Sequence, residues 1–550
     1  MLLVCVVIAL AGRANAGACR DPIQASAEVQ LGDRLFRETR FAQFFFAFLQ
    51  ANPKRTVNTP LRPGDPTVKV EQNATGKPIR DPFRNQSMNC RNCHLGNDLL
   101  STSRFDGRTY ADFASRSPVP PRTDGMTTTP RNSQELVSVS IRREVPTVFH
   151  FDGEFASIPD LTLATLTGRN FGWLPSEFAQ AEAHIVNVIR NDNGKSALAR
   201  RYGCGGFPYS VVLKGTDPRL PQSLVLPEQY RIYVTTATDD EIMQDLGALI
   251  LAYMNSIAFN LDEPPSPYDV FLTKNGLPSA PDSGETNLAY SQRLLGLVNG
   301  LSDPQFVTQP QDGMLRLHKG QRFQFGATEL QGLKVFLTQP SAPVAAGAGN
   351  CVACHTPPAF TDNIFHNTGV SQTEYDRIFG AGHFAALAVP DLSTRNADFD
   401  AYLPPTPTHP GASGIFRSPA LSANPNLTDL GVWNVFANPD LPNPQSALAQ
   451  ILCAEFNLSQ ASCTPDVVLP MTIGFFKTPA LRDLGQSSPY LHNGSLATIA
   501  EVLNFYSVVS GQARAGQLRN ASPELANVFI NLDDEITVGA FLYSLNEDYK

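Results

Sequence analysis

The chain has 550 residues, of which 42% are hydrophobic and 17% are charged, and its formal net charge at pH 7 is −9. This length exceeds what one hydrophobic core supports and predicts two or three domains, while the negative charge argues against nucleic acid or an anionic membrane surface as a partner. The 44 prolines and 39 glycines predict helices that are separated by long connections.

The N-terminal segment is apolar and ends in Ala14-Asn15-Ala16, which has the pattern of a signal-peptide cleavage site. We expect residues 1–16 to be removed and the mature protein to be periplasmic and soluble. No later apolar run reaches the roughly 18 residues needed to span a bilayer. A buried N-terminal helix is the alternative. Cys19 is a poor lipid-anchor candidate, because the preceding residues lack an aliphatic side chain at the third position before it.

Two short motifs carry the strongest chemical signal. Residues 90–94 read CRNCH, and residues 351–355 read CVACH. The C-x-x-C-H pattern is typical of c-type haem attachment, in which two thiols bind the porphyrin edge and the adjacent imidazole ligates the iron. The predicted attachment cysteines and iron-ligating histidines are Cys90, Cys93 and His94 for the first haem, and Cys351, Cys354 and His355 for the second.

Two other uses of these cysteines were weighed against haem attachment. A thioredoxin-like redox pair would leave both adjacent histidines unexplained. A four-cysteine zinc site would require two cysteine pairs some 260 residues apart to converge. We therefore predict two covalently bound haem groups.

Helical periodicity marks further elements along the chain. Residues 239–259 predict an amphipathic helix that ends the first half and precedes a linker rich in Pro and Gly. The run 223–236 predicts minor β structure. In the second half, residues 328–339 begin a helix leading into the second motif, and residues 532–548 predict a terminal helix. Proline-rich residues 371–470 predict a loop-rich insertion.

Four cysteines remain outside the signal segment and the haem motifs, and an oxidising compartment would pair them in two disulfides. Cys453 and Cys463 form the favoured pair because they close a short loop, which stabilises the fold by about 2–3 kcal/mol. A disulfide between Cys19 and Cys204 then follows by elimination.

Several stretches together resemble the bacterial di-haem cytochrome c peroxidase and MauG family. They are LGDRLFRETRF (31–41), PRNS (130–133), FHFDGE (149–154), CVACHTPPAFTDNIFHNTGV (351–370) and FFKTPALRDLGQSSPYLHNGSLATIAEVLNFYS (475–507). The resemblance implies a mainly α fold with two cytochrome c-like haem domains, 17–262 and 263–550, joined by long loops and containing minor β structure. The insertion at about 371–470 interrupts the second domain.

The resemblance also implies an oxidoreductase. The first haem would react with hydrogen peroxide to form high-valent iron, and the second would store or relay oxidising equivalents drawn from an unidentified electron donor. One alternative is an electron-transfer cytochrome without peroxide chemistry, which would show no spectral change at the first haem on mixing with peroxide. Another is a di-haem oxygenase acting on a hydrophobic substrate, for which dioxygen consumption would be the sign.

The ligand opposite His355 follows from the same resemblance. In the family it lies 14 residues after the histidine of the PY-x-H-x-G motif, which is His492 here, and the count reaches Tyr506. Peroxidases of the family carry methionine at this place, whereas the MauG branch carries tyrosine. A phenolate is a hard, anionic donor that favours ferric iron. The alternative is an ordinary tyrosine buried in an amphipathic helix.

The first iron is expected to keep an open coordination site. No histidine occurs between His94 and His150 to block it, and Met126 is more simply a packing residue. Glu177 aligns with the glutamate that moves protons during peroxide cleavage in the family, although a carboxylate here could instead stabilise a helix N-terminus. His184, a second candidate on the distal side, also fits a core position.

Two further sites are implied by the resemblance. Phe151 occupies the position of the family's inter-haem tryptophan and is much harder to oxidise, so electrons would need a different route or would tunnel directly. Calcium between the domains would bind Asn132, Ser487 and Pro489, since oxygen ligands suit this ion. Asn132 could also simply cap a turn.

Overall fold

The computed structural model describes residues 25–59, 89–90, 93–94, 116, 119, 121–134, 136, 145–203, 205–257, 266–308, 324–341, 347–482, 484 and 488–546. Within these ranges helices dominate, and the paired strands form one two-stranded antiparallel sheet. This confirms the predicted mainly α fold with minor β structure. The signal segment, a Cys19–Cys204 disulfide and Ser487 lie outside the described residues.

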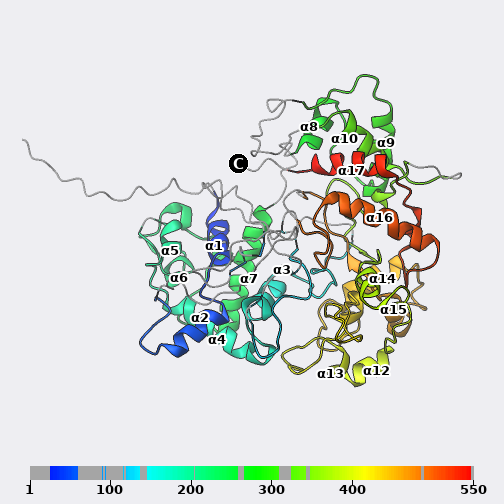
Figure 1. The fold of residues 1–550 in the computed structure, drawn as a ribbon. Coiled ribbons are helices and arrows are strands. Elements are labelled where there is room, and N and C mark those ends of the chain that lie inside the picture. Colours follow the sequence, from blue (N-terminus) through cyan, green and yellow to red (C-terminus); the bar gives the residue numbers. More distant parts are fainter. Residues whose placement is uncertain are drawn as a thin grey trace, which may run out of the picture.

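The first half is built around a crossing of two helices (Figure 1). Its helices are α1 (Ala27–Phe36), α2 (Gln43–Ala51), α3 (Ile158–Leu166), α4 (Phe178–Asn191), α5 (Ala197–Arg201), α6 (Tyr209–Val212) and α7 (Asp239–Ser256). Helix α7 matches the predicted helix 239–259 and begins at a capping box formed by Thr238 and Glu241. Helix α1 crosses α7 closely, because a Cβ built on Gly32 would overlap the carbonyl oxygen of Leu249.

The second half repeats this arrangement. Its helices are α8 (Pro267–Lys274), α9 (Asn287–Asn299), α10 (Ala327–Leu337), α11 (Val370–Phe379), α12 (Leu392–Ala397), α13 (Phe399–Tyr402), α14 (Gln445–Glu455), α15 (Pro465–Met471), α16 (Ile499–Arg514) and α17 (Leu532–Tyr543). Helices α10 and α17 cover the predicted segments 328–339 and 532–548. They cross at Gly332, where a Cβ would overlap the backbone of Thr537. In each half, an earlier helix (α1 or α10) packs closely against the last helix (α7 or α17) because a glycine lies at their contact.

The predicted β structure at 223–236 is wrong. This segment forms two short 3-10 turns, Gln222–Leu224 and Glu228–Tyr230, on either side of Pro227. Proline lacks the N–H that a strand ladder needs. The two strands of the described residues are instead β1 (Phe365–His366) and β2 (Phe476–Lys477), which pair antiparallel.

Buried side chains gather in three hydrophobic clusters. One belongs to the first half and one to the helices α8–α10 and α17 of the second half. The third contains mainly residues of the insertion, with Trp433 completely buried at its centre. The insertion therefore has a core of its own, and α12–α15 form a separate group in Figure 1. The predicted disulfide between Cys453 and Cys463 is present and links α14 to the loop before α15.

Buried ion pairs connect the insertion to the first half. Arg131 is 2.6 Å from Asp429 and 2.5 Å from Asp152, and Arg417 is 3.2 Å from Asp152 and 2.5 Å from Glu154. Asp152 is completely buried. Burial by itself would raise the pKa of Asp429, but the Arg131 guanidinium outweighs burial and lowers this pKa to about 2. The two segments are therefore joined by charges that water does not screen.

Replacing Arg131 with methionine is expected to lower the free energy of unfolding by about 3–5 kcal/mol, because it leaves buried carboxylates without a counter-charge. Denaturant unfolding would measure the loss. The matched control is Arg219→Met, which breaks an exposed pair with Asp217 and should change the stability little, because water screens the two charges. Equal effects of both substitutions would contradict a stabilising role of the buried network.

The same pair gives a pH dependence. The pKa of Asp429 is lower in the folded state than its ordinary value of 3.8. Its contribution to stability is therefore complete above that value and declines as the pH falls towards about 2.

Among the described residues, no helix combines the length and the apolar character that crossing a membrane requires.

Candidate haem-binding site

The two C-x-x-C-H motifs fold into the same local turn. The backbone N–H of His94 donates to the carbonyl of Cys90 at 3.0 Å, and the N–H of His355 donates to the carbonyl of Cys351 at 2.8 Å. In the second motif this turn is the 3-10 helix Cys351–Ala353. Each turn places two cysteines and one histidine next to each other, as the spacing predicted.

Both imidazoles are held by backbone carbonyl groups. The Nδ1 of His94 lies 2.9 Å from the carbonyl oxygen of Gln134, and the Nδ1 of His355 lies 3.0 Å from that of Phe360. A carbonyl can only accept, so Nδ1 donates its proton and Nε2 keeps a lone pair for a metal. Burial lowers the pKa of His94 to about 4 and also lowers that of His355. Both rings are therefore neutral at pH 7.

The cysteines do not resemble a redox pair of the thioredoxin type. Burial, followed by the charge of the neighbouring cysteine, raises the pKa of Cys90 and of Cys351 to about 12 in each case. Reactive cysteines instead have lowered pKa values. Among the described residues, no metal-ligand group combines cysteines of both motifs, which leaves the four-cysteine zinc site without support.

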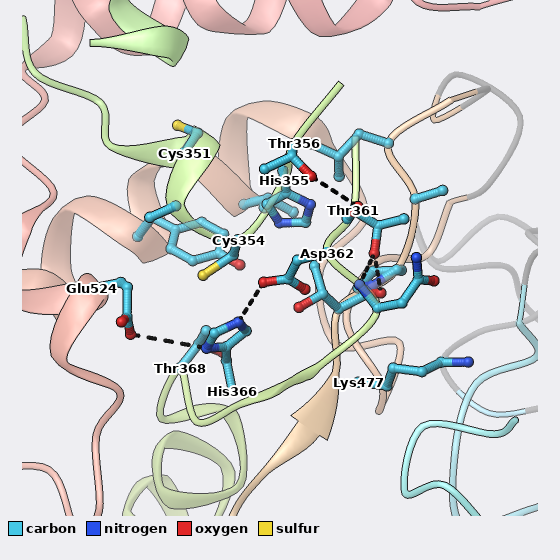
Figure 2. Close-up of a pocket in the computed structure, with 18 of the residues that line it drawn as sticks. Cys351, Cys354, His355, Thr356, Thr361, Asp362, His366, Thr368, Lys477 and Glu524 are labelled. Atoms are coloured by element: carbon cyan, nitrogen blue, oxygen red, sulfur yellow. Dashed lines mark hydrogen bonds and ion pairs between the residues drawn. The ribbon is translucent and has the colours of Figure 1, made fainter. Parts of the chain in front are cut away.

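A cavity of about 990 Å³ adjoins the second motif. Interiors of folded proteins are normally close-packed, and this volume lies at the upper end of the range for ligand and cofactor pockets. Cys351, Cys354 and His355 line it, and so does Tyr506 of α16. Figure 2 shows the sulfur atoms of these two cysteines and the His355 ring, which form part of the cavity wall. The side chains present are therefore those that a covalently attached haem with a second axial ligand would need.

Phe151 and His492 bring the two halves together at the edge of this cavity. Their ring centroids are 6.4 Å apart in an edge-on contact, and Phe476 stacks on His492 with a centroid distance of 3.6 Å. Both Phe151 and His492 line the cavity. No tryptophan takes part in this stack, so the geometry is compatible with the expectation that Phe151 replaces the family's redox-active residue.

Two of the three predicted calcium ligands are neighbours. The side-chain amide of Asn132 donates to the carbonyl oxygen of Pro489 at 2.5 Å, and the backbone N–H of Asn132 donates to the carbonyl of His492. The side chain of Asn132 is also close to the N–H of Ser133. These contacts tie the two halves together without an ion, and calcium binding stays a prediction.

Glu177 lies where the 3-10 turn Pro175–Glu177 meets α4. Its carboxylate accepts hydrogen bonds from Arg122 at 2.5 Å and from the backbone N–H of Leu174 at 2.9 Å. Each carboxylate oxygen keeps a further lone pair that can take a proton, and the catalytic role of Glu177 stays a prediction. His184 lies in the core, where its Nε2 bonds the carbonyl of Arg40 and burial lowers its pKa to about 4.

A polar cluster beside Cys354 is not predicted by the sequence. His366 and Asp362 lie in the stretch after the second motif, and Glu455 and Glu524 join them from distant segments. A histidine four residues after an aspartate was visible in the sequence, but nothing local pointed to the two glutamates.

Comparisons with known proteins were made by sequence and by structure. No protein-family model matches the chain. It is 26% identical over 169 residues to the cytochrome-c peroxidase IdrP2 of Denitromonas iodatirespirans, covering 31% of each protein. It is 23% identical over 202 residues to the IdrP2 of Pseudomonas sp. (strain SCT), covering 37% of each. The match to the cytochrome-c peroxidase IdrP1 of Denitromonas iodatirespirans is 50% identical over 44 residues, or 8% of this chain and 12% of that protein. The matched regions thus span 31% and 37% of the two IdrP2 proteins.

Solved structures were also compared. The diheme peroxidase BthA from Burkholderia thailandensis E264 has 16% sequence identity and a TM-score of 0.44, with 97% of this chain and 88% of that chain covered. A MauG-like protein associated with microbial copper homeostasis has 15% identity and a TM-score of 0.42, with 95% and 90% covered. Such low TM-scores carry no argument about function. The sequence matches, together with the two C-x-x-C-H motifs, confirm the predicted similarity to cytochrome-c peroxidases over about a third of this chain.

Proposed function

We propose that this protein is an exported, periplasmic di-haem c-type oxidoreductase that acts on hydrogen peroxide at its first haem and draws electrons from a donor through its second. The observation that carries the proposal is the cavity wall on which Cys351, Cys354, His355 and Tyr506 occur together. The names of the curated relatives support the peroxidase activity. The two halves correspond to two haem domains, 17–262 and 263–550.

In this proposal the bound haem groups supply the redox chemistry, and the chain positions and tunes them. Cys90 and Cys93 attach the first haem, and the neutral His94 ring offers Nε2 to its iron. Burial of that ring keeps it unprotonated. Tyr506 supplies a second ligand on the other haem and favours its oxidised form, which places the protein nearer to the MauG branch than to peroxidases with a methionine ligand.

Mixing the ferric holoprotein with hydrogen peroxide tests the proposal. A rapid change in the absorption of the first haem, followed by a slower change at the second, is the expected result. An unchanged spectrum at millimolar peroxide would overturn the peroxidase proposal and favour an electron-transfer cytochrome.

Glu177→Gln is expected to slow the reaction with peroxide by about 10²–10⁴-fold, because an amide cannot take up the proton. Glutamine can still accept the hydrogen bond from the N–H of Leu174, so the start of α4 should be preserved. Stopped-flow absorption measures the rate, and Glu182→Gln on the same helix is the matched control. Equal rates in the wild type and in Glu177→Gln would remove Glu177 from the catalytic machinery.

A further inference from the structure

A histidine and two glutamates from separate segments meet beside the second haem motif. His366 belongs to β1, Glu455 ends α14 of the insertion, and Glu524 lies in the 3-10 helix Pro523–Asn527. The Nδ1 of His366 is 3.5 Å from a carboxylate oxygen of Glu455 and 3.9 Å from one of Glu524. One ligand atom from each of the three side chains lies within 4.8 Å of the others.

The hydrogen bond on the opposite side of the ring fixes the tautomer of His366. Its Nε2 is 2.8 Å from a carboxylate oxygen of Asp362 (Figure 2). An ionised carboxylate only accepts, so Nε2 carries a proton and donates it. The neutral ring then presents a lone pair on Nδ1 to Glu455 and Glu524. A carboxylate that bonds the far nitrogen of a metal-binding histidine is a recurrent feature of metal sites.

Neither glutamate hydrogen-bonds this nitrogen, although His366 is only 5% exposed. The Cys354 sulfur also interacts with the ring, but haem attachment would convert it into a neutral thioether. The separations of 3.5 and 3.9 Å are too long for hydrogen bonds. An oxygen of Glu524 is likewise buried without a partner. Three groups with lone pairs therefore lie close together, an arrangement that a positive charge would stabilise.

That charge could be a proton on Nδ1. Burial opposes protonation, but the charges of Cys354 and Asp362 outweigh it and raise the pKa of His366 above its ordinary value. The Cys354 contribution comes from a thiolate, which haem attachment would convert into a neutral thioether. The pKa of Glu455 is raised to about 6, which reflects the same excess of negative charge. Burial raises this pKa most, the charge of His366 lowers it, and the charge of Glu524 raises it further. One imidazolium would leave the carboxylates only partly neutralised.

We propose that His366, Glu455 and Glu524 form a binding site for one divalent first-row transition-metal ion such as Mn²⁺ or Zn²⁺. One imidazole nitrogen and two carboxylate oxygens suit these ions. Ligand atoms about 2.1 Å from a tetrahedral ion lie about 3.4 Å from one another, so the side chains need to move little. The side chain of Glu524 is 34% exposed, which leaves a path for the ion and for water ligands.

The site goes beyond the proposed peroxidase function. His366 and Glu524 line the same cavity as Cys354, whereas Glu455 of the insertion does not. The proposed ion would nevertheless have ligands different from those of the haem irons and of the calcium position at Asn132. Because His366 is close enough to interact with Cys354, a bound ion would place positive charge beside the attachment point of the second haem. Occupancy should therefore raise the reduction potential of that haem.

Titration of the metal-depleted holoprotein with Mn²⁺ tests the proposal, with calcium present in excess to fill the site at Asn132. Electron paramagnetic resonance reports free Mn²⁺, and we expect one ion bound per chain and displaced by Zn²⁺. Glu455→Gln and Glu524→Gln should each weaken binding by about tenfold or more, and Asp362→Asn, which changes a positioning residue, by about 10–100-fold. The control is Glu228→Gln, an exposed glutamate of the first half.

A second measurement covers the case in which a variant folds poorly. Mn²⁺ or Zn²⁺ should raise the thermal midpoint of the wild type and of Glu228→Gln, because a ligand that binds only the folded state stabilises it. The double variant Glu455→Gln/Glu524→Gln should keep its haem spectrum and show no such rise. Equal metal affinity in the wild type and the double variant would overturn the proposal, as would no binding at millimolar metal. Either outcome would leave the peroxide reaction unaffected.

Discussion

Tyr506→Phe is expected to convert the second haem from low-spin to partly high-spin ferric iron while the signal of the first haem is unchanged. Phenylalanine removes the oxygen donor and keeps the ring that lines the cavity. Loss of an anionic ligand should also raise the reduction potential of this haem. Electron paramagnetic resonance measures the spin state, and a redox titration measures the potential.

The acidity of Tyr506 adds a pH dependence to this prediction. Burial, together with the charges of Cys354 and Cys351, raises the pKa of Tyr506 above its ordinary value. Burial would persist after haem attachment, so the Tyr506 side chain would take up a proton if reduction of the iron displaced it. The reduced state then holds one more proton than the oxidised state. The potential should fall by about 59 mV per pH unit in the wild type, and this slope should vanish in Tyr506→Phe.

Tyr490→Phe is the matched control for both measurements. Tyr490 lines the same cavity, but its hydroxyl donates to the carbonyl oxygen of Leu484 at 2.5 Å. Its removal should therefore leave the spin state and the pH slope intact. If Tyr506→Phe gave the same spectrum as the wild type, another side chain would have to ligate the iron. His492, His366 or a methionine would then be the candidates, and ligation by His366 would also be incompatible with the metal site proposed above.

The double substitution Cys351→Ala/Cys354→Ala should remove one haem and leave the other. Both thioether bonds of the second haem depend on these sulfurs, whereas Cys90 and Cys93 are unchanged. The intact mass of the mature chain should fall by one haem group, and the haem absorbance per chain should halve. The cavity of about 990 Å³ would lose its occupant, so the second half should also unfold at a lower temperature.

Cys453→Ala/Cys463→Ala is the control for loss of two cysteines. It breaks the disulfide of the insertion and should cost about 2–3 kcal/mol of stability by loop-closure entropy, with both haems retained. Zinc in place of haem in the native protein would contradict the whole assignment.

The sequence by itself determined the features that depend on neighbouring residues. The two C-x-x-C-H turns, the helix starts and the Cys453–Cys463 disulfide involve groups a few positions apart, so spacing alone predicts them. Periodicity likewise predicted α7, α10 and α17, because each helix buries one face. The strand predicted at 223–236 is wrong, because the apolar residues there belong to short 3-10 turns and irregular segments. Tyr506 came from a resemblance, since no local pattern relates it to His355.

Only the tertiary structure decided which distant polar groups meet. The Arg131–Asp429 pair and the cluster of His366, Glu455 and Glu524 join segments that lie far apart in sequence. The proline-rich sequence of the insertion also did not predict its hydrophobic core, in which Trp433 is completely buried. A charged residue has the same local appearance whether it faces water or a partner. Its role depends on how deeply folding buries it and on whether folding brings an opposite charge close to it. Neither can be predicted from the neighbouring residues in the sequence.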